Sequence, residues 1–140
     1  MSDRDGCAFC RIIDGRDPAH LVLDDAAAVA FLDARPVFPG HVLVVPRRHV
    51  DTLTDLDAAD LGRFFGVVQR VERAVRAATE SPGSFVAMNN VVSQSVPHLH
   101  VHVVPRRRKD GLRGFFWPRQ RYADDDEMAA TAARIRDAVE

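Results

Sequence analysis

The chain has 140 residues, of which 46% are hydrophobic and 28% charged, and its net charge at neutral pH is −1. This length fits one domain with a core of its own. The balanced charge gives no reason to expect nucleic-acid binding, and no apolar stretch approaches the ~20 residues that cross a membrane. The N-terminus is polar and unlike a secretion signal, so we expect a cytoplasmic protein whose two cysteines are reduced thiols or metal ligands.

The first half of the chain predicts short strands joined by tight connections. Residues 7–13 form a brief apolar segment. Residues 21–23 and 29–32 are rich in branched apolar side chains and flank a turn, which indicates a pair of strands. Residues 41–45 are continuously apolar after their first histidine, which is typical of a buried strand, and Pro46 ends it.

The second half predicts two helices and two further strands. Apolar residues recur every three or four positions over residues 57–79, which indicates an amphipathic helix. Asp55 or Asp57 can cap its start. Residues 84–88 resemble another strand, and a strand with three histidines follows. Residues 124–139 predict a last helix, whose acidic first turn suits the positive end of the helix dipole.

This order of elements favours an α+β fold, with an antiparallel sheet and helices packed on one face. We expect residues 1–140 to form one domain that ends in a C-terminal tail and helix, residues 107–140. Basic residues gather at its start, from Arg106 to Lys109, and can attract a phosphorylated small molecule or simply form a solvated loop. Residues 115–117 read Phe-Phe-Trp and can stack on a base, bind a partner or cover the core.

Three histidines at alternating positions carry the most chemical information: His98, His100 and His102. Side chains two apart on a strand share a face, so three imidazoles are expected on one surface. The apolar residues between them can anchor the other face in the core. Imidazole exchanges protons near neutral pH and also binds zinc, so the trio alone indicates either a catalytic site or a metal site.

The segments around the trio resemble the histidine triad family. Residues 98–104 match its defining order: His, apolar, His, apolar, His, apolar, apolar. The other segments that resemble it are 31–33 (Phe-Leu-Asp), 39–49 (Pro-Gly-His through Pro-Arg-Arg-His), Asn89-Asn90, Gln94-Ser95 and Pro105-Arg106. The similarity runs over roughly residues 7–106 and implies a histidine triad fold, a homodimer and a purine nucleotide ligand. It also implies that residues 107–140 are a specificity tail that shapes the choice of leaving group.

The resemblance implies hydrolysis or transfer at the α-phosphorus of nucleoside phosphoramidates, acyl-adenylates or dinucleoside polyphosphates. His100 matches the nucleophile, whose ring nitrogen would form a covalent nucleotidyl intermediate. The other implied catalytic residues are His98, His102, His41 and Ser95, with Ser95 on the leaving group. The implied nucleotide contacts are Phe9, Ile13, Leu32, Asp33, Asn89 and Gln94, with Asp33 accepting from the ribose hydroxyls.

Plainer roles stay open for several of these residues. The Asp33 carboxylate and the Ser95 hydroxyl can each stabilise a turn, and Phe9 and Ile13 can be ordinary core residues. His20 has the pattern of a surface histidine.

A Cys-x-x-Cys pair at Cys7 and Cys10 indicates a second site. Two thiolates at this spacing reach one zinc ion, a structural zinc takes four ligands, and the chain has no other cysteine. The resemblance to bacterial members of the family implies that His49 and His98 complete the set around a structural zinc. Two buried thiols or a redox pair are the alternatives.

The chain departs from the family between Asn89 and Gln94. The loop is short, and Ser93 stands where the family has a glycine that lets the backbone approach phosphate. This departure puts the Asn89 contact in question. Two other functions stay open: a non-catalytic nucleotide-binding sensor on the same scaffold, and a zinc-dependent hydrolase that uses the three strand histidines as ligands.

Overall fold

The computed structural model describes residues 3–112 and 119–140, so the predictions for residues 115–117 lie outside the described part. The chain divides into two compact units, Met1–Arg108 and Lys109–Glu140. Within the described residues, no helix is both long enough and apolar enough to span a bilayer.

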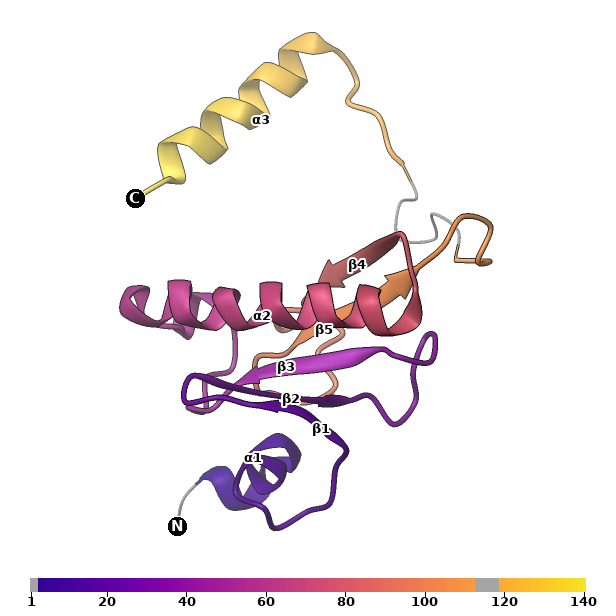
Figure 1. Ribbon diagram of the computed structural model, residues 1–140. Helices are drawn as coiled ribbons and strands as arrows, with labels where there is room; N and C mark the ends of the chain where they lie inside the picture. Colours follow the sequence, from indigo (N-terminus) through magenta and orange to yellow (C-terminus); the bar gives the residue numbers. More distant parts are fainter. Residues whose placement is uncertain (1–2, 113–118) are drawn as a thin grey trace. The chain divides into compact units, whose positions relative to one another are not determined.

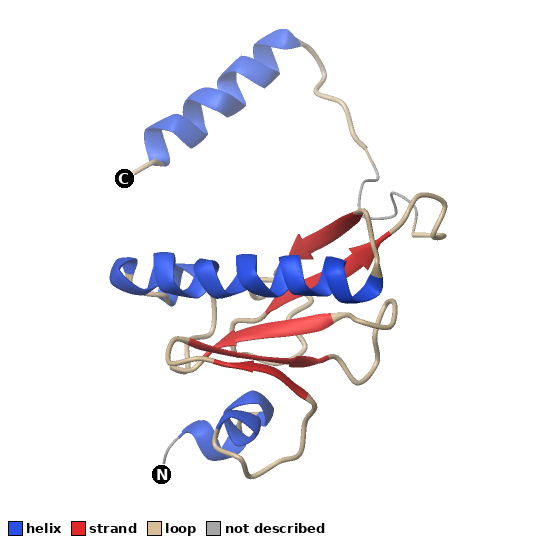
Figure 2. Cartoon of the chain, in the orientation of Figure 1, coloured by secondary structure: helices blue, strands red, loops and turns tan. Residues whose placement is uncertain are grey.

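The first unit is built on one antiparallel sheet in the order β1-β2-β3-β5-β4 (Figures 1 and 2). Its strands are β1 (Leu21–Asp24), β2 (Ala28–Leu32), β3 (Val42–Pro46), β4 (Gly83–Ala87) and β5 (Val101–Arg106). The helical elements are η1 (Asp3–Gly6), α1 (Ala8–Ile13), η2 (Leu53–Asp55) and α2 (Ala58–Thr79). This α+β architecture is the predicted one.

The central strands are buried on both faces because their apolar side chains alternate in direction. Ala28 and Ala30 of β2 pack with Val42 and Val44 of β3 in a core under α2. The intervening residues of both strands face the opposite side and pack against α1: Val29, Phe31, Leu43 and Val45. The expectation of helices on one face is therefore corrected, since α1 and α2 cover opposite faces (Figure 1).

The long helix keeps its predicted bounds to within one residue. Asp57 takes the N-cap position without a capping hydrogen bond, and its carboxylate instead accepts from Arg48 at 2.5 Å. The apolar stripe of α2 supplies the other half of the core, through Phe64, Val67, Val68, Val71 and Val75. At about 25 cal/mol per Å² of apolar area, burial of one such side chain is worth roughly 1.5–3 kcal/mol.

The histidine segment differs from the prediction of one continuous strand. β5 begins only at Val101. His98 lies in a bend before it, and the His98 N–H donates to the Val96 carbonyl at 2.8 Å. The side chains still alternate, because Leu99, Val101 and Val103 all enter the core under α2. The bend turns His98 away from the other two histidines and toward α1.

The second unit contains α3 (Asp125–Ala138). Its N-cap residue Asp124 accepts from the Glu127 N–H at 2.8 Å, which satisfies one of the orphan donors of the first turn. The helix lies within one residue of its predicted bounds at each end.

Candidate functional site

His100 presents one ring nitrogen to a cavity. Its Nδ1 lies 2.8 Å from the carbonyl oxygen of His98. A carbonyl only accepts, so Nδ1 carries the proton and Nε2 keeps its lone pair. The ring is buried and lines a cavity of about 470 Å³ together with His102. The tautomer of His100 is therefore the one that a nitrogen nucleophile needs.

His41 and His102 form a hydrogen-bonded pair whose direction is also fixed. The Val37 backbone N–H donates to His41 Nδ1 at 3.1 Å. Because an N–H only donates, His41 is protonated on Nε2, which lies 2.9 Å from His102 Nδ1. His102 accepts there, so its own proton sits on Nε2, which is free to donate to a phosphate oxygen. The resemblance implies catalytic roles for both residues, and the geometry fixes Nε2 as the hydrogen-bond donor of each ring.

Burial keeps this pair neutral. Desolvation lowers the pKa of His41 against the opposing effect of Asp33. Desolvation, and then the neighbouring His100 and His41, lower the pKa of His102 to about 4. The Asp33 carboxylate lies 3.6 Å from His41 Nε2. The side chains of Asp33, His41 and His102 are close enough together to share an ion. However, His41 Nε2 carries a proton and therefore has no lone pair to offer a metal.

The second site brings together the four residues expected to hold zinc. The ligand atoms of Cys7, Cys10, His49 and His98 all lie within 4.8 Å of one another. Cys10 Sγ is 3.2 Å from His49 Nδ1 and 3.4 Å from His98 Nδ1. A tetrahedral zinc with ordinary Zn–S and Zn–N bonds spaces sulfur and nitrogen about 3.6 Å apart. The cluster therefore has close to the spacing of a closed Cys2His2 site.

In His98 and His49, a hydrogen bond donated by Nε2 leaves the lone pair on Nδ1, the nitrogen that faces the cysteines. His98 Nε2 donates to the Pro46 carbonyl at 2.9 Å, and His49 Nε2 donates to the Asp51 carboxylate at 2.9 Å. Each Nδ1 thus points a lone pair at the sulfurs, as outer partners of metal ligands commonly arrange. Burial raises the pKa of the Cys10 thiol to about 11, so the ion would have to displace a proton there.

This arrangement places the three histidines in two different sites. His98 belongs to the cysteine cluster through its side chain and to the cavity only through the carbonyl that holds His100. His100 and His102 stay together, with ring centroids 5.1 Å apart. The three rings do not converge on one point, which argues against the hypothesis of a zinc ion held by all three.

The cavity collects three of the six residues implied for nucleotide contact, Phe9, Leu32 and Asp33. Ser95, one of the implied catalytic residues, lines it as well. Phe9 stands edge-on to His100, with ring centroids 5.0 Å apart at 81°, and also to Phe31 at 5.4 Å. Flat apolar walls of this kind suit a base. Sequence reasoning missed Ile12, which lines the cavity where Ile13 does not, and it missed His20.

Asn89 and Gln94 lie outside the cavity lining. Asn89 is exposed. Gln94 stabilises its own loop, because its side chain accepts from the Val91 N–H at 3.2 Å and donates to the Asp51 carbonyl at 2.5 Å. The loop is also strained, since Val91 and Ser93 have φ values of 70° and 63°. A left-handed backbone favours glycine. This explains why the family has a glycine at the position that Ser93 occupies in this chain.

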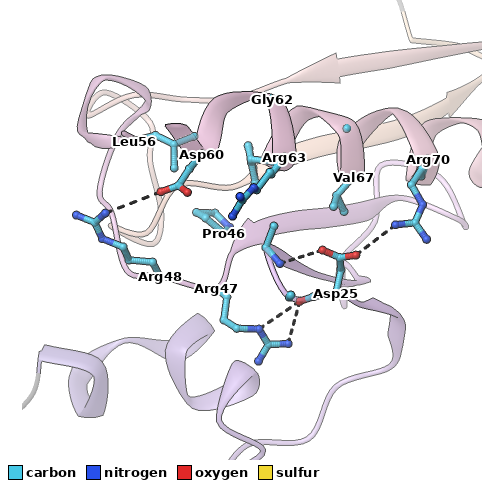
Figure 3. Close-up of a pocket in the computed structure, with 14 residues that line it drawn as sticks. Asp25, Pro46, Arg47, Arg48, Leu56, Asp60, Gly62, Arg63, Val67 and Arg70 are labelled. Atoms are coloured by element: carbon cyan, nitrogen blue, oxygen red, sulfur yellow. Dashed lines mark hydrogen bonds and ion pairs between the residues drawn. The ribbon is translucent and has the colours of Figure 1, made fainter. Parts of the chain in front are cut away.

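A larger cavity of about 670 Å³ lies elsewhere, between α2 and the ends of β1 and β3 (Figure 3). Four arginines line it: Arg47, Arg48, Arg63 and Arg70. Carboxylates pair with three of them: Asp24 with Arg47, Asp57 with Arg48, and Asp25 with Arg70. Three of the four arginines are therefore paired with carboxylates in the lining or beside it, and none of the lining residues belongs to the histidine cavity.

Comparison with known proteins matches residues 14–109 to the HIT domain. An uncharacterized HIT-like protein of Mycobacterium tuberculosis is 36% identical over 138 residues, which cover 95% of this chain and 92% of the relative. An adenosine 5′-monophosphoramidase of Candida albicans is 27% identical over 98% of this chain and 93% of its own.

Solved structures give the same picture. A HIT family protein of Bacillus anthracis superimposes with a TM-score of 0.85 at 31% identity, over 97% of this chain and 99% of that one. A zinc-bound histidine triad family protein of Mycobacterium smegmatis has a TM-score of 0.74 at 34% identity, over 97% and 99% of the two chains.

Proposed function

The chain belongs to the histidine triad (HIT) family, and from that premise we propose that it is a nucleotide hydrolase or nucleotidyl transferase acting at the α-phosphorus through His100. The observation that carries this proposal is the fixed tautomer of His100, whose Nε2 lone pair faces a cavity with apolar walls. The named activity of the Candida albicans relative supports nucleoside phosphoramidates as the first substrates to test. Acyl-adenylates and dinucleoside polyphosphates offer the same α-phosphorus.

In the first step, the Nε2 lone pair of His100 forms a bond to phosphorus while the bond from phosphorus to the leaving group breaks. For a phosphoramidate, the departing amine takes up one proton from solvent, which the second step returns. The hydrogen bond from His41 leaves the His102 proton on Nε2. This N–H can donate to a phosphate oxygen whose negative charge grows in the transition state. Ser95 is exposed and lines the cavity, so its hydroxyl can donate to the leaving group.

In the second step, water replaces His100 on phosphorus and releases a nucleoside monophosphate and one proton. The Nε2–P bond breaks, and the His98 carbonyl still holds Nδ1–H, so the ring leaves as the neutral tautomer that began the cycle. Two displacements at phosphorus, with the same His100 nitrogen first attacking and then leaving, replace a single difficult one. Asp33 would hold the ribose hydroxyls, since its side chain lines the cavity. One of its oxygens accepts from the Arg35 N–H at 2.8 Å, and the other, 3.6 Å from His41 Nε2, has further lone pairs to accept with.

Zinc is proposed as the occupant of the Cys7, Cys10, His49 and His98 cluster, where it would supply a structural link between α1 and the histidine segment. The zinc-bound Mycobacterium smegmatis relative supports this assignment. A homodimer and a cytoplasmic location remain predictions from the sequence.

Turnover of adenosine 5′-phosphoramidate by the wild-type chain and by the His100→Gln variant tests the proposal. Glutamine keeps the side chain polar and removes the nucleophile. We expect kcat to fall about 10⁴-fold or more, while the affinity for AMP changes less than about threefold. Wild-type protein that binds AMP but turns over none of the three substrate classes would instead indicate a non-catalytic nucleotide-binding protein.

A further inference from the structure

His20 is the one titratable residue of the histidine cavity that has no part in the proposed reaction. It lies directly before β1, is exposed, and lines the same cavity as His100. Its carbonyl accepts from the Leu32 N–H at 3.0 Å. Since Leu32 precedes Asp33 in the chain, this main-chain bond fixes His20 beside the wall that leads to the proposed ribose contact.

The polar groups of the cavity divide between two places. Asp33, His100 and His102 gather around the proposed reaction centre, where Asp33 lies 3.6 Å from His41 and the rings of His100 and His102 are 5.1 Å apart. His20 instead follows the apolar lining residues Pro18 and Ala19. Of the three lining residues in this segment, 18–20, His20 is the one with a polar side chain.

The ring of His20 is available for a ligand. No hydrogen bond or ion pair joins it to another side chain in the described part of the chain, whereas each of the other five imidazoles is held on at least one nitrogen. A neutral imidazole offers one donor and one acceptor. In ligand sites, apolar walls bind the faces of a flat ring, and a few polar groups at its rim decide which ring is accepted.

We propose that His20 is a specificity-determining residue that hydrogen-bonds the polar edge of a purine base seated in this cavity. The proposal rests on the proposed function for the identity of the ligand as a purine nucleotide. It adds the residue that reads the base, which neither the triad nor the zinc cluster does. His20 takes no part in the displacement at phosphorus, so its removal affects binding rather than the chemical step.

The affinities of AMP and of three analogues test this proposal. Each analogue lacks one polar group of the base: the 6-amino group, N7 or N1. Wild-type protein is expected to bind at least one analogue roughly 2- to 10-fold more weakly than AMP, the loss that one hydrogen bond accounts for. In the His20→Phe variant, which keeps a flat ring without hydrogen-bonding groups, that difference should disappear.

Val22→Ala is the matched control, because Val22 is an exposed residue of β1 outside the cavity lining. It should keep the wild-type pattern of affinities. For phosphoramidate turnover, His20→Phe should raise KM and leave kcat within about twofold. If His20→Phe keeps every wild-type affinity difference in full, or if wild-type protein shows none, the assignment of His20 is overturned.

The same measurements separate this inference from the proposed function. Wild-type protein that neither binds AMP nor turns over a nucleotide would remove the proposed function and with it the ligand of His20. Wild-type protein that binds and turns over the nucleotide, while His20→Phe shows unchanged base discrimination, would contradict the His20 assignment alone.

Discussion

Single main-chain and side-chain bonds decide the protonation of the site histidines. The Val37 N–H can only donate and the His98 carbonyl can only accept, so His41 is protonated on Nε2 and His100 on Nδ1. His102 takes its tautomer from His41. The same residue type therefore presents a lone pair in one place and an N–H in another, because the groups behind each ring differ. In the proposed reaction the first is the nucleophile and the second donates a hydrogen bond to phosphate.

The depressed pKa of His102 predicts a pH-dependent stability. In the unfolded chain this histidine has its ordinary pKa of 6.5, and in the folded chain the value is about 4. Between these values the unfolded chain binds the extra proton, so the free energy of unfolding falls as pH drops from 6.5 to 4. After a discount for partial exposure, this contribution is about 1–3 kcal/mol.

Denaturant titrations of wild-type protein and His102→Asn at pH 7 and pH 4 measure this contribution. The variant lacks the titrating ring, so its stability relative to wild type should improve by that amount at pH 4. His98, whose pKa shift does not involve His102, titrates in both proteins and cancels in the difference. A stability difference that is the same at both pH values would show that His102 is not held neutral by folding.

At the scale of elements, the short helix α1 depends on what surrounds it. Six residues are too few for a helix that is stable alone. Cys7 at its N-cap and Cys10 within it lie on either side of Phe9, which packs on His100. A metal at the cysteine cluster would therefore fix a cavity wall as well as the helix. The same cluster holds His98, whose carbonyl orients His100.

Removal of zinc is therefore expected to loosen both features. Protein purified with zinc should contain one ion per chain, and chelation should lower its Tm by roughly 10 °C or more. The KM for phosphoramidate should rise because Phe9 loses its anchor. Cys10→Ser should bind zinc weakly and respond little to the chelator; a Tm that chelation leaves unchanged in metal-loaded wild-type protein would contradict this account.

The turn before β3 has no room for a side chain. Gly40 has a φ of +99°, and an added Cβ would lie 2.7 Å from the Thr79 methyl group. Gly40→Ala combines backbone strain with a contact on the end of α2, so we expect a loss of about 2–4 kcal/mol of unfolding free energy.

Gly66→Ala is the matched control for this substitution. Gly66 lies in the middle of α2, and an added Cβ would have no neighbour within 4 Å beyond the helix's own backbone, so alanine should stabilise the helix by about 0.5–1 kcal/mol. Thermal or urea unfolding measures both variants. Equal effects of the two substitutions would show that the turn tolerates a side chain.

At the scale of the whole molecule, the sheet formed by the described residues ends at β4, whose Val86 is 44% exposed. Phe65 of α2 packs only partly into the core. An edge strand and an apolar helix face of this kind are suited to pairing about a twofold axis, which is how the sequence-based prediction of a homodimer would be realised.

Light scattering of the wild-type chain and of Val86→Lys tests this arrangement. A charge at the centre of a paired edge should shift the protein from dimer toward monomer without loss of the fold, because Val86 is outside the core. Ser84→Lys is not equivalent, since Ser84 hydrogen-bonds Glu72. A wild-type monomer at micromolar concentration, or a variant that remains dimeric, would contradict the proposed interface.

Much of this molecule could be predicted from local sequence. The periodicity of residues 57–79 predicted α2, and the apolar runs predicted the strands, because burial imposes those spacings. The four residues expected to hold zinc are together in space. The bend at His98 could not be predicted, since it depends on the Cys7 and Cys10 contacts from a segment 88 or more residues away in the chain.

Two other features of the cavity lining could not be predicted either, because they also depend on contacts between segments distant in the chain. Ile12 and Ile13 are equally apolar, and only the packing of α1 on the sheet decides which one faces the cavity. His20 stands in the chain beside Pro18 and Ala19, and its pairing with Leu32 brings it to the cavity.

The covalent intermediate provides the most direct test of the central claim that His100 is the nucleophile. Wild-type protein mixed with adenosine 5′-phosphoramidate, quenched at alkaline pH and examined by intact mass and peptide mapping, should carry one adenylyl group on His100. His100→Gln should carry none. Turnover by wild-type protein without any adduct under rapid quenching, or an adduct mapped to another residue, would contradict the account.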